Sequence, residues 1–214
     1  MTTPRLPERL LALTPGRTRD ADGAARLARS VGAACEAGLR SVLIREPLLG
    51  DGDLLVLARR LVDLARTLPG LWIGVHDRVH VALAAGAHGV HVGHRSLTVR
   101  EARGVAGEGL CLGFSAHEHD APSLREGADY LIFGPLHDTP SKRGLLPPTG
   151  HEALARCAGS FHGPVWAIGG LRLGRVRGAR EAGAFGVAVL SDLLGAPDPV
   201  ERARAWCEEP ACRG

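Results

Sequence analysis

The 214-residue sequence predicts an α/β fold, a single (β/α)8 TIM barrel that spans residues 1–214. Short apolar runs alternate with amphipathic stretches, which is typical of a parallel sheet whose strands are buried on both faces. A glycine precedes several of these runs, in the phrases EAGLRSV, AAGAHGV, REGADYL and EAGAFGV, where it suits a left-handed helix cap. Eight such units share the chain at about 27 residues each, which favours one closed domain over two. The last few residues are candidates for disorder.

Eight mainly apolar runs are expected to form the strands. Each is short and lies between amphipathic stretches, as in a sheet built from βα units. In chain order, the expected strands are Leu10–Thr14, Ser41–Arg45, Leu71–His76, Gly89–Val92, Leu110–Ser115, Tyr130–Gly134, Val165–Ile168 and Gly186–Leu190.

The stretches between the strands carry hydrophobic residues at helical spacing. In chain order, the expected helices are Ala24–Gly38, Leu54–Leu68, Val79–Gly86, Val99–Val105, Pro122–Gly127, His151–Ala158, Leu173–Gly183 and Val200–Cys207. An open, doubly wound sheet is the alternative fold, but no GxGxxG phrase follows the first strand.

Composition excludes several classes of function. Lys and Arg number 26 against 23 for Asp and Glu, and the arginines are scattered, so no nucleic-acid partner is expected. Aromatic residues make up only 4%, too few for a base-stacking surface. The five cysteines form no CxxC pair, and neither a signal peptide nor an apolar run of ~20 residues occurs. We therefore expect a cytoplasmic protein that contacts no membrane, and its charge remains compatible with a small anionic ligand.

Charged residues follow the second and third strands, and barrels carry their chemistry on the loops that follow strands. Arg45 ends the second strand, His76 ends the third, and Asp77 follows it directly. Burying an unpaired charge is costly, so each needs a partner or a ligand. Two structural roles compete with ligand binding: Arg45 and Asp77 could pair, or Asp77 could cap the helix expected at Val79.

A histidine stands at the end of the fifth strand, in the phrase Ser115-Ala116-His117-Glu118-His119. An imidazole titrates near neutral pH, so His117 in this position can move protons. The structural alternative is a core histidine satisfied by backbone hydrogen bonds. His119 is expected on the following turn and is the weaker candidate.

The connection after the sixth strand, residues 134–144, is the longest one before a helix. It carries Thr139, Ser141 and Lys142, two hydroxyls and a cation that suit phosphate oxygens. A long loop in a compact domain is usually a binding loop or a lid. A solvated basic surface loop is the structural alternative.

Glycines follow the seventh strand, and a serine follows the eighth. Gly169 and Gly170 allow backbone N–H groups to approach an anion, and Leu190 and Ser191 lie at the end of the next strand. Because barrels often bind phosphate after strands seven and eight, these residues predict a phosphate site.

The order of motifs resembles the thiamine phosphate synthase/TenI superfamily over nearly the whole chain. The phrases that carry the resemblance are LIREP, HDRVHVALAAGAHGVHVG, LGFSAHE, ADYLIFGPLHDTPSKRG, PVWAIGGL and GAFGVAVLS. The resemblance implies a phosphate-binding (β/α)8 barrel, a homodimer, that acts on the thiazole phosphate of vitamin B1. The family's two activities are coupling of that phosphate to an aminopyrimidine pyrophosphate and tautomerisation of the thiazole to its aromatic form.

The family pattern carries over only in part on the pyrimidine half of the site. Arg45 matches the arginine of a QxRxK phrase, whereas Leu43 and Pro47 stand at its Gln and Lys positions. The second magnesium-binding aspartate of the synthases falls at Ser96. Magnesium requires oxygen ligands, and one carboxylate supports it weakly.

The third strand keeps more of the pattern, since Asp77 and Arg78 match an NDR phrase with His76 at the Asn position. The thiazole-phosphate half is complete. The residues that fit it are Ser115, Thr139, Ser141, Lys142, Gly169, Gly170 and Ser191.

A complete thiazole-phosphate half beside an incomplete pyrimidine half favours a TenI-like thiazole tautomerase. His117 would act as general acid/base beside Arg45, and no metal or other cofactor is expected. One alternative is a thiamine phosphate synthase, in which Asp77 would bind magnesium and pyrophosphate would be released. A noncatalytic phosphate-ligand binding or regulatory protein is the other alternative, because a fold does not guarantee chemistry.

Overall fold

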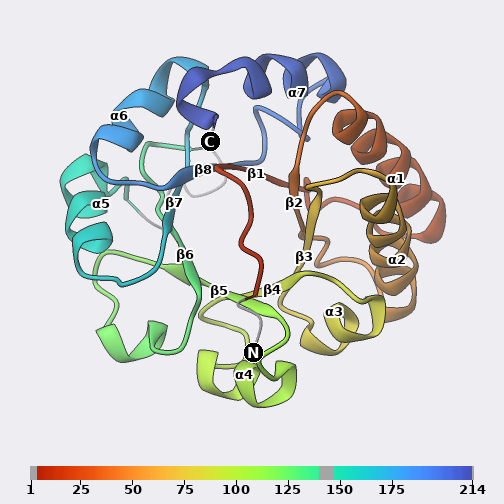
Figure 1. The fold of residues 1–214 in the computed structure, drawn as a ribbon, viewed down its shortest axis with the longest axis horizontal. Helices are drawn as coiled ribbons and strands as arrows, with labels where there is room; N and C mark the ends of the chain where they lie inside the picture. Colours follow the sequence, from red (N-terminus) through yellow and green to blue (C-terminus); the bar gives the residue numbers. More distant parts are fainter. Residues whose placement is uncertain (1–3, 140–146, 214) are drawn as a thin grey trace.

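The computed structural model describes residues 4–139 and 147–213 and confirms the predicted barrel (Figure 1). Eight parallel strands form one closed sheet in chain order. The strands are β1 (Leu10–Leu13), β2 (Ser41–Ile44), β3 (Trp72–His76), β4 (Gly89–Val92), β5 (Cys111–Ala116), β6 (Tyr130–Phe133), β7 (Val165–Ile168) and β8 (Gly186–Val189). Because β8 pairs with β1, the open doubly wound sheet is excluded.

An outer layer of helices surrounds the barrel (Figure 1). The α-helices are α1 (Ala21–Glu36), α2 (Asp51–Thr67), α3 (Val79–Ala85), α4 (Val99–Ala106), α5 (Gly150–Gly159), α6 (Val176–Glu181) and α7 (Pro199–Glu208). Three 3-10 turns are η1 (Pro122–Arg125), η2 (Leu173–Arg175) and η3 (Pro210–Cys212). None of the described helices is both long and apolar enough to cross a bilayer.

The glycine phrases end their helices as predicted. The first glycine of each of the four phrases has positive φ, and Gly86 takes the left-handed conformation directly after α3. One helix prediction was wrong. The stretch 122–127 forms only the 3-10 turn η1, which starts at a proline and ends before Gly127 at φ 87°. The stretch predicted as the helix 173–183 is helical from Leu173 to Glu181, first as η2 and then as α6.

The 3-10 turn η3 packs near the end of the chain, and Cys212 in it is buried. The cysteines are free thiols, as expected, and all are buried except the partly exposed Cys207.

The barrel interior is filled by large side chains. Trp72, Tyr130 and Trp166 are fully buried and pack in one cluster with the inward-facing aliphatic residues. Glycines make room for them: a Cβ at Gly74 would collide with the Trp72 ring, and one at Gly113 with the Tyr130 ring. The interior is therefore a packed core and not a channel.

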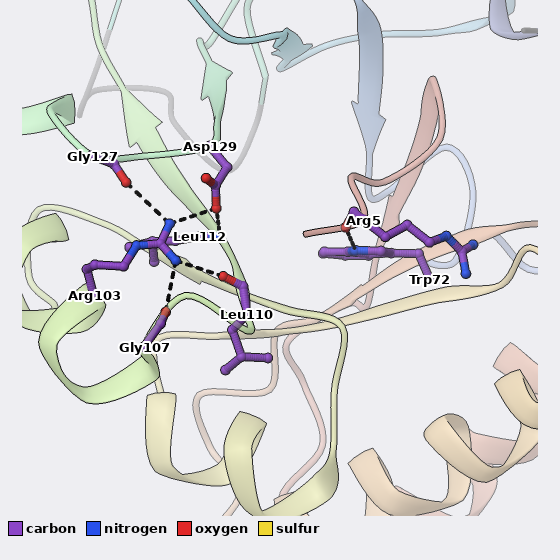
Figure 2. Close-up of polar contacts among 8 residues, drawn as sticks. All are labelled: Arg5, Trp72, Arg103, Gly107, Leu110, Leu112, Gly127 and Asp129. Carbon is purple, nitrogen blue, oxygen red and sulfur yellow. Dashed lines mark hydrogen bonds and ion pairs between the residues drawn. The ribbon is translucent and has the colours of Figure 1, made fainter. Parts of the chain in front are cut away.

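The N-terminal segment closes the end of the barrel where the strands begin. Figure 1 shows this segment crossing the barrel in front of the sheet before it enters β1. The Nε1 atom of Trp72 donates to the carbonyl oxygen of Arg5 (2.9 Å), as Figure 2 shows, and Nε1 of Trp166 donates to that of Glu8 (3.0 Å). Ligands must therefore bind at the opposite end, where the strands finish.

An ion pair joins α4 to the strands beside it (Figure 2). Arg103 donates to Asp129 Oδ2 (2.7 Å) and to the carbonyl oxygens of Gly107 (3.0 Å) and Leu110 (2.9 Å). The same carboxylate oxygen accepts the backbone N–H of Leu112 (2.7 Å). These bonds hold the start of β5 against the connection to β6. They therefore help to position the strand that leads to His117.

Candidate functional site

Two of the cavities at the ends of the strands contain predicted site residues. The first, of about 880 Å³, lies among the loops that follow β6, β7 and β8, and the second, of about 330 Å³, among those that follow β2 to β5. Predicted residues that line the first cavity are Thr139, Gly170 and Ser191. Predicted residues that line the second are Arg45, His76, Asp77, Ser115 and His117.

Paired glycines bring two loops together at the first cavity. Gly169 and Gly170 have φ of 102° and 61°, in the region that favours glycine. A Cβ at Gly170 would lie 2.7 Å from the carbonyl oxygen of Asp138 and 2.8 Å from the Cβ of His137. The backbone N–H of His137 also donates to the carbonyl oxygen of Gly169 (3.1 Å). Gly170 must therefore be a glycine because the two loops touch at this point. This requirement is separate from any need for backbone N–H groups to approach an anion.

Two arginines that sequence reasoning missed line the same cavity. Arg172 and Arg175 belong to the η2 region directly after the paired glycines, and Arg175 donates to the carbonyl oxygen of Gly170 (2.9 Å). The sequence signal that could have identified them is a pair of arginines shortly after two consecutive glycines. Their charges favour an anionic ligand.

His137 is a further polar group in this cavity. Its Nε2 atom is buried and has no hydrogen-bond partner within the described ranges. Burial, Arg175 and His151 lower the pKa of His137, which favours the neutral ring. A neutral imidazole offers either a donor or an acceptor to a ligand.

Three other residues were predicted to bind phosphate, namely Ser141, Lys142 and Leu190. Ser141 and Lys142 lie outside the described residues. Leu190 is not among the residues that line the first cavity and packs against the barrel interior, while its carbonyl oxygen accepts from the N–H of Gly195 (2.9 Å). Leu190 therefore shapes the turn after β8, and the neighbouring Ser191 faces the cavity.

His117 follows β5 directly and lines the second cavity. Its Nδ1 atom is 2.7 Å from the carbonyl oxygen of Gly134, at the end of β6. A carbonyl can only accept, so Nδ1 carries the proton and Nε2 is the nitrogen that can take up or return one. This geometry suits a general acid/base.

A buried polar chain reaches the second cavity from inside the barrel. His91, in β4, bonds through Nδ1 to the Tyr130 hydroxyl (3.2 Å) and through Nε2 to Ser115 Oγ (2.9 Å). Burial, and the neighbouring His76, hold the pKa of His91 well below its ordinary value. Sequence reasoning missed His91 because one histidine in a strand of apolar residues gives no sign of its partners on other strands.

His76 lies beside this chain and faces the cavity. Burial and the Arg45 guanidinium lower the pKa of His76 to about 4. His76 is therefore neutral at physiological pH and presents a polar ring without charge to the cavity.

The structural roles offered for Arg45 and Asp77 were wrong. Among the described residues no ion pair joins them, and α3 starts after Arg78 without a side-chain cap. Asp77 has φ 72°, whereas an N-cap residue needs extended backbone. Its N–H donates to the carbonyl oxygen of His91 (2.8 Å) on β4. The N–H of Arg78 donates to the carbonyl oxygen of His76 (2.9 Å), so the backbone turns sharply as it leaves β3.

The second cavity fits a magnesium ion poorly. Its lining carboxylates are Asp77 and Glu46, and Glu46 is already bound: its oxygens accept the N–H groups of Gly16 (2.9 Å) and Thr18 (2.8 Å). Ser96 Oγ accepts the N–H of Gly93 (3.0 Å). One carboxylate remains, too few for a protein-held magnesium site, and no metal-binding group of three His, Cys, Asp or Glu occurs in the part of the chain that the structure describes.

Comparisons with known proteins agree with this arrangement. Residues 13–193 match the family model described as thiamine monophosphate synthase. The thiamine-phosphate synthase of Salinispora arenicola is 44% identical over 162 residues, 72% of this chain and 78% of the relative. That of Roseiflexus castenholzii is 36% identical over 197 residues, 91% of this chain and 86% of the relative.

Among solved structures, thiamine phosphate pyrophosphorylase from Pyrococcus furiosus matches with a TM-score of 0.77 and 29% identity. The match covers 92% of each chain. Fold, order of motifs and sequence identity thus agree, and this chain belongs to the thiamine monophosphate synthase/TenI family.

Proposed function

We propose that this chain is a thiamine-phosphate synthase, which couples an aminopyrimidine pyrophosphate to a thiazole phosphate and releases pyrophosphate. The geometric observation that carries the proposal is the pair of separate cavities at the ends of the strands, both lined by arginines, the second of which also contains His117. A reaction with two phosphorylated substrates needs two such places, and the names of the relatives favour the same reaction. The tautomerase favoured by sequence alone becomes the second candidate.

The thiazole phosphate would occupy the first cavity. Arg172 and Arg175 supply positive charge there, Ser191 and Thr149 line it with hydroxyls, and the glycine turn leaves room for an anion beside the backbone. Fixing the phosphate on this side holds the ring at a set distance from His117.

The aminopyrimidine pyrophosphate would occupy the second cavity, where Arg45 and Arg95 face the ligand. In the coupling step the methylene–oxygen bond breaks and its electron pair leaves with pyrophosphate, while the lone pair of the thiazole nitrogen forms the new carbon–nitrogen bond. The two guanidinium groups neutralise the leaving charge in place of a protein-held metal. His117 can donate a hydrogen bond through Nε2 to the departing oxygen when it is protonated.

The tautomerase is favoured by one specific observation, the poor fit of the second cavity to magnesium. Isomerisation needs no leaving group and therefore no metal. His117 Nε2 would remove a proton from the ring carbon and return it to the exocyclic carbon, with the phosphate fixed as above.

One set of assays distinguishes the candidates. The purified protein is given thiazole phosphate with aminopyrimidine pyrophosphate, and pyrophosphate release is followed with and without magnesium. A second assay supplies only the non-aromatic carboxythiazole phosphate and follows its aromatisation. Pyrophosphate release supports the synthase, and aromatisation alone supports the tautomerase. Tight binding of thiazole phosphate without either reaction overturns both and supports a binding or regulatory protein.

A further inference from the structure

A histidine that plays no part in the roles above stacks on His117. The ring centroids of His94 and His117 are 4.7 Å apart, and the ring planes differ by only 11°. Phe114 contacts His94 in turn, with ring centroids 5.2 Å apart. The ring of His117 therefore lies against a second flat ring that is itself supported by the core.

Asp120 holds both histidines with one carboxylate. Its Oδ1 atom lies 2.8 Å from Nε2 of His94, and its Oδ2 atom accepts the backbone N–H of His117 (2.7 Å). The Asp120 side chain is only 14% exposed, so water competes weakly for these bonds. The carboxylate fixes the backbone of His117 and the ring that stacks on it at the same time.

The bonds also fix which nitrogens carry protons. A carboxylate accepts, so Nε2 of His94 is protonated, just as the Gly134 carbonyl requires a proton on Nδ1 of His117. With its backbone, its Nδ1 atom and one ring face all held, His117 has a single orientation, and Nε2 is the nitrogen left for the substrate.

We propose that His94 and Asp120 are positioning residues, which hold the ring of His117 in its reactive orientation. This inference rests on the proposed function, because it assigns their effect to the group that serves the reaction. Rotation of an unstacked His117 ring would move Nε2 away from the substrate, and a misplacement of about 1 Å can lower a rate about 100-fold.

Nitrogen NMR of the ring tests the orientation without any substrate. ¹⁵N-labelled protein is compared with His94→Ala, His94→Phe and Asp120→Asn, and His117→Gln identifies the His117 signals. The matched control is His119→Ala, an exposed histidine in the same loop. We expect one Nδ1–H tautomer of His117 in the unmodified protein, in His119→Ala and in His94→Phe, which keeps the stacked ring. A mixture of tautomers is expected in His94→Ala and Asp120→Asn.

Kinetics supply the second measurement on the same variants. We expect His94→Ala to lower kcat about 10–100-fold with KM for thiazole phosphate nearly unchanged, and His94→Phe to restore most of kcat. A His94→Ala protein with the unmodified tautomer signal and kcat overturns the inference. If the unmodified protein catalyses neither reaction yet its tautomer signal depends on His94, the proposed function fails and the positioning role stands.

Discussion

The Nδ1 atom of His117 lies 2.7 Å from the carbonyl oxygen of Gly134, so the ring is tied to the end of β6 and directs Nε2 away from that bond. Replacing His117 by Ala or Gln should lower kcat about 10²–10⁴-fold, the usual contribution of a positioned proton-transfer group. Affinity for thiazole phosphate, measured by calorimetry, should change little, because we propose that this phosphate binds in the other cavity. A variant that melts early but reacts at the normal rate would instead indicate a purely structural histidine.

Gly170 should not tolerate a side chain. In Gly170→Val the new Cβ would meet the Asp138 carbonyl oxygen and His137, and its φ of 61° strains any β-branched residue. We expect thiazole phosphate to bind at least 10-fold more weakly, because the two loops must separate and the first cavity changes shape. Gly174→Val is the matched control, since a Cβ there meets nothing within 4 Å. Equal affinity of a folded Gly170→Val protein would show that the glycine turn does not shape the phosphate site.

The strands could be predicted closely from the sequence because each is buried on both faces, and a buried parallel strand leaves an uninterrupted apolar run. β4 and β7 have the predicted ends, and the other strands differ by a residue or so. The short helical elements were less predictable. Pro122 suits the first turn of any helix, yet η1 ends after four residues, before Gly127 at φ 87°.

Functional residues could be predicted where they directly follow a strand, as His117 and Arg45 do. His94 and Asp120 could not, because their relationship joins loops that are 26 residues apart in the chain. His91 lies inside the barrel, where its partners Tyr130 and Ser115 come from β6 and β5. Contacts between strands leave no spacing pattern in a single sequence.

Catalysis should persist without added magnesium. The second cavity offers one uncommitted carboxylate, and Arg45 and Arg95 supply the positive charge for a leaving pyrophosphate. With excess chelator we therefore expect the coupling rate to fall less than about threefold, whereas Arg95→Gln should reduce it about 10-fold or more. Arg100→Gln, on the exposed face of α4, serves as the control for loss of one charge. Complete loss of activity with chelator would mean that Asp77 and the substrate phosphates hold a metal together.

Stability should decline with falling pH between about 6.5 and 4 because of His76. Burial and Arg45 lower its pKa to about 4 in the folded protein, against an ordinary value of 6.5. In that window the unfolded chain binds a proton that the folded protein does not, so the free energy of unfolding falls as pH falls, by at most about 1.4 kcal/mol per pH unit for one histidine. Below pH 4 both states are protonated and the decline from this residue ends.

Denaturant unfolding at pH 7.5, 6.5, 5.5 and 4.5 measures this dependence. His76→Asn should show a shallower decline than the unmodified protein, while His119→Asn, an exposed histidine, should match it. His91 should act in the same direction as His76, since burial also lowers its pKa. Identical slopes for His76→Asn and the unmodified protein would contradict the assignment.

The hydrogen bonds and ion pair of Asp129 should contribute far more to the free energy of unfolding than those of an exposed acidic residue. Asp129→Ala removes the partner of Arg103 and leaves the backbone N–H of Leu112, at the start of β5, without its carboxylate acceptor. We expect a loss of about 2–3 kcal/mol in the free energy of unfolding, because hydrogen bonds to charged groups contribute more than neutral ones. Asp63→Ala breaks an ion pair of similar length with Arg66 on the surface of α2, where both side chains are more than half exposed, and should cost less than about 1 kcal/mol. Urea unfolding of the two variants side by side would decide the matter, and equal losses would mean that the Arg103–Asp129 pair contributes no more than a solvated surface contact.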